Sequence, residues 1–168
     1  MVSAAAGLAF IHGYHRGKSP EERLQVVKLF VELGNDVNQP DDYGITPLMA
    51  AGNYGNVLII QYLIDVGADL SAHDLGKKND GQFGSSNEPL MRAAFAADLE
   101  LVKLLLDRGA DPKIISRDGE TMVSAAAGLA FIHGYHRGKS PEERLQVVKL
   151  FVELGNDVNQ PDDYGITP

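Results

Sequence analysis

The segment GITPLMAAGNYGNVLIIQYLIDVGADLSAHD, residues 44–74, has the residue spacing expected of two short helices in succession. Thr46 and Pro47 are expected to open the first helix, since proline fits the first helical position. Asn56 is expected to cap the second helix, and Gly67 stands where a left-handed C-cap belongs. Between them, apolar residues recur at helical spacing, namely Val57, Ile60, Leu63 and Ile64. The segment therefore predicts a helix-turn-helix.

The same pattern returns in the segment EPLMRAAFAADLELVKLLLDRGADPKIISRD, residues 88–118. Asp98 is the expected N-cap of its second helix, and Gly109 is expected to end that helix. The residues expected to form its buried stripe are Leu101, Val102, Leu104 and Leu105. A second helix-turn-helix is therefore predicted here.

A longer helix is predicted twice from the sequence SPEERLQVVKLFVELG, at residues 19–34 and 140–155. Serine caps the helix, proline fits its first position, and the second glutamate completes a capping box. The glycines at the two ends, Gly34 and Gly155, are expected to end these helices. Together with the preceding segments, this pattern predicts an all-α chain.

These segments resemble the ankyrin repeat, whose signature runs G-x-T-P-L-H-x-A-A, then V-x-L-L-L, then G-A-D-x-N. GITPLMAA at 44–51, VKLLLDRGADP at 102–112 and GADLSAHD at 67–74 carry the resemblance, which extends over essentially the whole chain. It implies an ankyrin-repeat solenoid of four helix-turn-helix units with long insertions, in a single domain at 1–168. The implied units are about 1–43, 44–85, 86–118 and 119–165. The histidine of the signature is replaced by Met49, Met91 and Ser124.

The first 47 residues, Met1–Pro47, are repeated without a difference as Met122–Pro168. Stacking constrains only the buried and turn positions of such units, so identity at loop and surface positions has no cause in the fold. A recent gene duplication is one explanation. We favour deliberate copying of a block, and the long insertions are similar to those of bacterial ankyrin-repeat proteins. The chain is therefore interpreted as engineered from a bacterial parent.

The duplication also predicts what the two ends of the stack expose. Each unit buries its apolar faces against its neighbours, and terminal capping units with polar outer faces are not evident in the sequence. The C-terminal unit should expose the surface that its N-terminal twin buries against the unit beginning near residue 44. We therefore expect an extendable scaffold whose copies stack head to tail or exchange end units. The alternative is a natural module that binds a partner protein on its concave face.

Composition excludes other partners and leaves the compartment open. The net charge is −8, without a concentrated basic patch, so nucleic acid is not expected as a partner. No signal peptide or apolar run of membrane length is evident, so no membrane association is expected. Cysteine is absent, which leaves localisation undetermined.

Two pairs of histidines are the candidate metal ligands. His12 and His15 occur in the sequence HGYH, which recurs as His133 and His136. Imidazoles three residues apart can bind zinc or nickel when a third ligand joins them. No acidic residue stands at an obvious partnering distance, so an ordinary polar loop is the favoured interpretation and no metal is predicted.

The long loop from Leu75 to Glu88 is expected to be a finger between the second and third units. A calcium-binding EF-hand would need a glutamate at its twelfth position, and counting from Asp74 reaches Ser85 instead. Fingers and inner helices line the concave face of the proteins that the chain resembles. The candidate partner-binding residues are therefore Tyr54, Lys77, Lys78 and Phe83. The alternative is a solvated loop with one aromatic ring packed beneath it.

No catalytic pattern is evident in the sequence. The glycines between Gly128 and Gly138 form neither G-x-G-x-x-G nor a phosphate-binding loop. The acidic residues sit at helix starts and turns, where capping and the helix dipole explain them. We expect no enzymatic activity and no cofactor.

Overall fold

The computed structural model describes residues 19–41, 44–54, 56–72, 88–116, 119–128 and 140–161, with the single residues 163, 165 and 167. In this part of the chain every regular element is an α-helix. The helices are α2 (Pro20–Glu32), α3 (Pro47–Tyr54), α4 (Val57–Asp65), α5 (Pro89–Phe95), α6 (Leu99–Asp107), α7 (Met122–Ala127) and α8 (Pro141–Glu153). The expected all-α class is confirmed.

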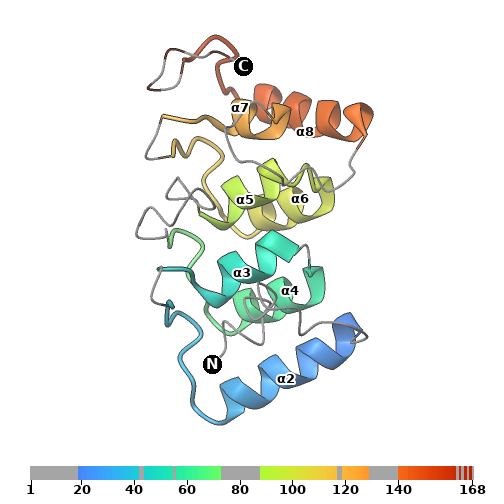
Figure 1. The fold of residues 1–168 in the computed structure, drawn as a ribbon, viewed down its shortest axis with the longest axis vertical. Coiled ribbons are helices and arrows are strands. Elements are labelled where there is room, and N and C mark those ends of the chain that lie inside the picture. The colour runs from blue at the N-terminus through green and yellow to red at the C-terminus, as the bar shows by residue number, and fades with distance from the viewer. Residues whose placement is uncertain are drawn as a thin grey trace.

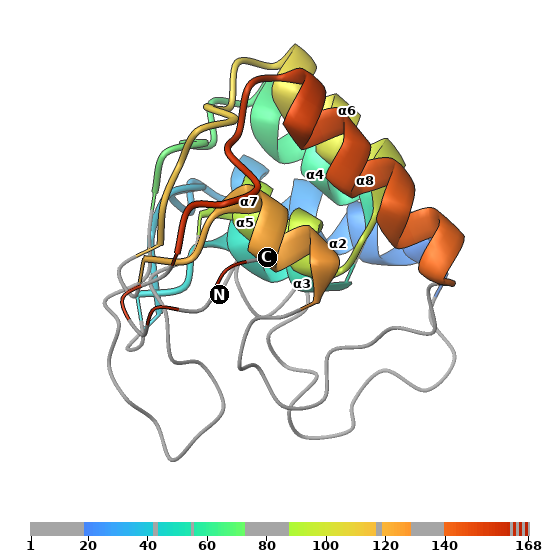
Figure 2. The same cartoon turned by 90° about the horizontal axis from the view of Figure 1, so that it is seen from above.

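The helices form a linear stack of two layers (Figure 1). The inner layer is α3, α5 and α7, in which each helix contacts the next. The outer layer is α2, α4, α6 and α8 (Figure 2), in which α2 contacts α4 and α6 contacts α8. Within each pair the inner helix also packs on its own outer helix, as α3 does on α4. The predicted solenoid of helical hairpins is therefore confirmed.

The outer helices begin at the expected caps. The side chain of Asn56 accepts a hydrogen bond from the Ile59 N–H at 3.2 Å, and that of Asp98 accepts one from the Leu101 N–H at 3.1 Å. At the start of α2 the Ser19 hydroxyl and the second glutamate form the predicted reciprocal box. Hydrogen bonds from the local backbone and from Ser19 also hold the pKa of the Glu21 carboxyl below its usual value.

The same box recurs at the start of α8, where the Ser140 N–H donates to Glu143 Oε2 at 2.8 Å. Each outer helix then ends at a glycine with a left-handed backbone, with φ of 82° at Gly34 and 95° at Gly67. The corresponding values at Gly109 and Gly155 are 91° and 85°. A residue with a side chain would be strained there, so these glycines set the lengths of the outer helices.

One continuous apolar core runs through the stack. In α6 the predicted stripe is buried at Leu101, Val102 and Leu105, whereas Leu104 is only half-buried and that expectation is corrected. The helix α6 contacts α5 and α8, and Leu104 packs only partly against the core. In α4 the buried side also includes Ile59, because α4 contacts both α2 and α3.

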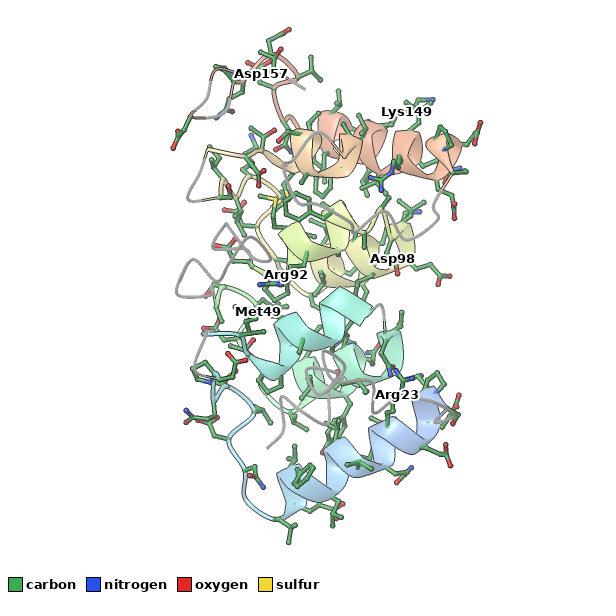
Figure 3. The ribbon with its side chains drawn as sticks, viewed as in Figure 1. Arg23, Met49, Arg92, Asp98, Lys149 and Asp157 are labelled. Carbon is green, nitrogen blue, oxygen red and sulfur yellow. The ribbon has the colours of Figure 1, made fainter. Side chains whose placement is uncertain are left out.

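The positions that replace the signature histidine lie inside the stack. Met49 and Met91 are fully buried, and Figure 3 shows Met49 on the inner helix α3. Ser124 is buried as well, and its hydroxyl donates to the Thr121 carbonyl at 2.9 Å. Apolar packing at two units and a local capping bond at the third therefore occupy these positions.

Candidate protein-binding surface

A row of four aspartates runs along the stack where the fingers begin. Each stands two residues after the glycine that ends an outer helix, and all four are exposed. We call them the finger row, and its members are Asp36, Asp69, Asp111 and Asp157. Figure 3 labels Asp157 at the end of the stack beyond α8. The repeat itself produces this alignment, because equivalent positions of stacked units lie above one another.

Each carboxylate of the finger row also shapes its own turn. One oxygen accepts a hydrogen bond from the backbone N–H two residues later, which is the Asx-turn arrangement. The donors are Asn38, Ser71, Lys113 and Asn159, at 2.8, 2.8, 2.9 and 2.8 Å. The carboxylates are therefore held in a regular orientation and still face solvent.

Farther along two of the fingers, a second polar side chain closes the turn before the inner helices α3 and α7. Asp41 Oδ1 accepts from the Ile45 N–H at 2.9 Å, and the Ser116 hydroxyl accepts from the Glu120 N–H at 3.0 Å. In both fingers a glycine with positive φ follows, Gly44 at 84° and Gly119 at 79°. The fingers thus have a defined backbone on which exposed side chains are displayed.

Ile115 is the large apolar side chain that these fingers leave in solvent. It is 49 % exposed and lies between the exposed Lys113 and the buried Ser116. Scattered exposed apolar residues are ordinary, but this one stands on a turn whose geometry is fixed on both sides. Ile115 is not among the candidate residues predicted from the sequence. The sequence does contain one sign of its role. Ile115 occupies the position that is Pro40 in the finger before α3, so an apolar residue replaces proline there.

The inner helices contribute little exposed surface in the described part of the chain. Four consecutive residues of α3, Leu48–Ala51, are buried, as is most of α5 and α7. Figure 3 shows the side chain of Arg92 on the inner helix α5, and it is 5 % exposed. The described surface available to a partner is therefore formed by the fingers, the outer helices and the end of the stack beyond α8, with little from the inner helices.

The residues singled out from the sequence fall largely outside the described residues. Tyr54 is the last residue of α3, so its backbone is placed on an inner helix as expected. The side chain of Tyr54 and the finger residues Lys77, Lys78 and Phe83 lie outside the described part. The four histidines, His12, His15, His133 and His136, lie outside it as well. Their proposed roles remain predictions.

The described residues offer no metal site and no membrane-spanning helix. There, no group of three histidine, cysteine or acidic side chains comes together in a way that could hold a metal ion. Among the same residues, no helix combines the length and the apolar character needed to cross a bilayer.

Residues 19–116 match the family model described as ankyrin repeats, three copies. This match covers more than half of the chain, and the stacked helical hairpins agree with it. The chain therefore belongs to the ankyrin-repeat family. Ankyrin repeats are generally protein-interaction modules without catalytic activity of their own.

Similar proteins differ widely in length. An E3 ubiquitin-protein ligase, hecd-1, of Caenorhabditis elegans is 37 % identical over 149 residues, which are 88 % of this chain and 5 % of the ligase. A putative ankyrin repeat protein, L271, of Acanthamoeba polyphaga mimivirus is 34 % identical over 60 % of this chain and 12 % of its own length. The human ankyrin repeat and SOCS box protein 6 is 29 % identical over 80 % of this chain and 33 % of its own length. The chain thus spans a third or less of these relatives.

Proposed function

We propose that the chain is a protein-interaction module that binds a partner through its fingers. The observation that carries this proposal is the ordered finger surface, on which Ile115 is half exposed beside the finger row. Protein interfaces commonly combine an apolar centre with a polar rim, and Ile115 among polar finger residues is compatible with that composition. The chain's charge of −8 and its exposed aspartates favour a partner that brings basic groups.

The candidate residues of the long finger extend this proposed surface. Three of them, Lys77, Lys78 and Phe83, belong to the segment between α4 and α5. Tyr54 is the last residue of the inner helix α3. In the proteins that the chain resembles, fingers and inner helices line the concave face, and this supports including these residues in the proposal. No enzymatic activity, metal or cofactor is part of this proposal.

Binding at the fingers is tested by two matched substitutions in the affinity-tagged chain. Ile115→Glu places a charge on the finger, whereas Leu58→Glu places one on α4, where Leu58 is 42 % exposed. Both baits are first checked by circular dichroism for the wild-type helix content. A protein captured by wild-type and Leu58→Glu baits, and lost with Ile115→Glu, is the expected result. Capture that is equal with all three baits contradicts binding at the fingers.

A second function is favoured by a separate observation, the 47 identical residues at the two ends. We propose that these ends allow copies of the chain to associate head to tail, as an extendable scaffold. The same identity, which reaches solvent-exposed positions such as Gln25 and Gln146, supports our proposal of an engineered chain copied from a bacterial parent. Light scattering across concentration tests this function, because a strictly monomeric chain at millimolar concentration contradicts it.

A further inference from the structure

The helices α2 and α8 have the same 13-residue sequence in two different environments. Val26 is 45 % exposed in α2, but its equivalent in α8, Val147, is fully buried. The next position reverses this order, since Val27 is fully buried in α2 and Val148 is only half-buried in α8. One sequence therefore presents different sides to its described neighbours, α4 in the first case and α6 with α7 in the second.

The side of α8 that points away from the stack is the side that α2 uses to bind α4. We call this surface the C-terminal face, formed by Leu145, Lys149, Val158 and Asn159. Leu145 is 50 % exposed and Val158 is 41 % exposed, and the two polar residues are exposed as well. Figure 3 shows Lys149 directed outward from the end of the stack. The equivalents of the two apolar residues, Leu24 and Val37, pack against the core.

The polar residues show the same contrast in more detail. In the first copy, the Lys28 ammonium lies 5.5 Å from the ring centroid of Tyr62 on α4. Asn38 donates to the Gly67 carbonyl at 3.1 Å and accepts from the Asp69 N–H at 2.8 Å. In the first copy, this surface therefore binds three features: an aromatic ring, an apolar helix face and the backbone of one finger. All three belong to residues 56–72.

We propose that the C-terminal face of one copy binds α4 and the following finger of a second copy, in place of that copy's own α2. The occupant is residues 56–72 of the second chain, because this segment already binds the identical surface within each molecule. The proposal rests on the head-to-tail association proposed above and names its interface. The contact joins unlike surfaces, so its repetition produces an open chain of molecules.

The exchange replaces one set of contacts with an identical set, so contact energy alone does not favour either arrangement. The position of the equilibrium then depends on the chain concentration relative to the effective concentration of the tethered α2. For short flexible connections, that effective concentration is on the order of 1 mM. Exchange in the wild-type chain should therefore become appreciable only as its concentration approaches the millimolar range.

The duplication allows each docking surface to be weakened separately. The double variant Leu24→Ala with Asn38→Ala weakens only the internal docking of α2. The double variant Leu145→Ala with Asn159→Ala changes the same two residue types on the C-terminal face alone. Each pair removes apolar contact and two hydrogen bonds from one arrangement, which is enough to shift an equilibrium about tenfold or more.

The test is sedimentation velocity of the full chain and its variants from the micromolar to the millimolar range, with circular dichroism to check folding. We expect the Leu24→Ala, Asn38→Ala variant to associate at a concentration about tenfold or more below that of the wild type. The Leu145→Ala, Asn159→Ala variant should remain monomeric, and adding these two changes to the first variant should abolish its association.

Two results would overturn the proposal. One is a monomeric Leu24→Ala, Asn38→Ala variant at millimolar concentration with helix content retained. The other is association that is insensitive to Leu145 and Asn159 but is lost in Val26→Asp, which would indicate simple stacking on the outer side of α2. The second result leaves head-to-tail association intact, so failure of the exchange is distinguishable from failure of the proposed scaffold function. Partner binding at Ile115 is scored independently of both.

Discussion

At the scale of single residues, contacts between adjacent units depend on a few positions that permit close approach. A Cβ atom built on Gly119 would lie 2.6 Å from the backbone nitrogen of Asp163 in the next finger. Gly165 has almost the same backbone, with φ of 77° against 79°, but nothing lies within 4 Å of its Cβ position. A side chain at either glycine would strain the backbone, but only at Gly119 would it also collide with a neighbouring finger. Comparing the two positions therefore distinguishes backbone strain from steric contact.

We predict that Gly119→Ala destabilises the chain more than Gly165→Ala does. Both substitutions place alanine in the left-handed region, at a cost of about 1 kcal/mol. Only Gly119→Ala also forces the Asp163 backbone to move, which should raise its loss to about 2 kcal/mol or more. Urea unfolding followed by circular dichroism measures the free energy of unfolding of both variants. Equal losses would show that the finger carrying Asp163 moves away from residue 119 without a cost in stability.

At the scale of elements, the helices and their ends could be predicted from the sequence, because they depend on local chemistry. Asn56, Asp98 and the two serine capping boxes are where the pattern placed them. Which side of a helix is buried could not be derived locally, since α2 and α8 share every residue and bury different ones. The exposure of Ile115 likewise could not be derived from helical periodicity, because Ile115 lies on a finger and not on a helix.

The same contrast predicts unequal effects of identical substitutions. Val147→Ala in α8 should cost about 2 kcal/mol, because two buried methyl groups are lost. Val26→Ala at the equivalent position of α2 should change the free energy of unfolding by about 0.5 kcal/mol or less, because that side chain is 45 % exposed. At the adjacent pair the order should reverse, with Val27→Ala costing more than Val148→Ala. Equal costs at either pair, measured by urea unfolding, would contradict the two environments described for the helices.

At the scale of the whole molecule, the described helices make their main contacts within a hairpin and with the adjacent hairpins. Adjacent units are also linked at the surface, for example by Arg108 Nη1 on Asp65 Oδ1 at 2.7 Å. Such partly exposed ion pairs contribute little, about 0–1 kcal/mol. Stability therefore comes mainly from apolar contact between stacked hairpins, and it should be greatest where a hairpin is covered on both sides.

We accordingly predict a gradient of amide hydrogen exchange along the stack. The amides of α5 and α6 should exchange most slowly, because hairpins pack on both of their sides. The amides of α2 should exchange faster, because α4 is its main contact among the described helices. Mass spectrometry of peptic peptides at about 25 °C measures this order, with micromolar protein so that association does not contribute. Uniform protection would mean that the stack opens only as a single cooperative unit.

The matched helices α2 and α8 also give the molecule a built-in reference state. Their intrinsic helix propensity, capping and local denatured-state structure are the same, because their residues are the same. When the free energies of local opening of α2 and α8 are subtracted, these shared contributions cancel. In ordinary mutational measurements they do not cancel. What remains is the coupling free energy between one hairpin and its neighbours, obtained within a single chain and under one set of solution conditions.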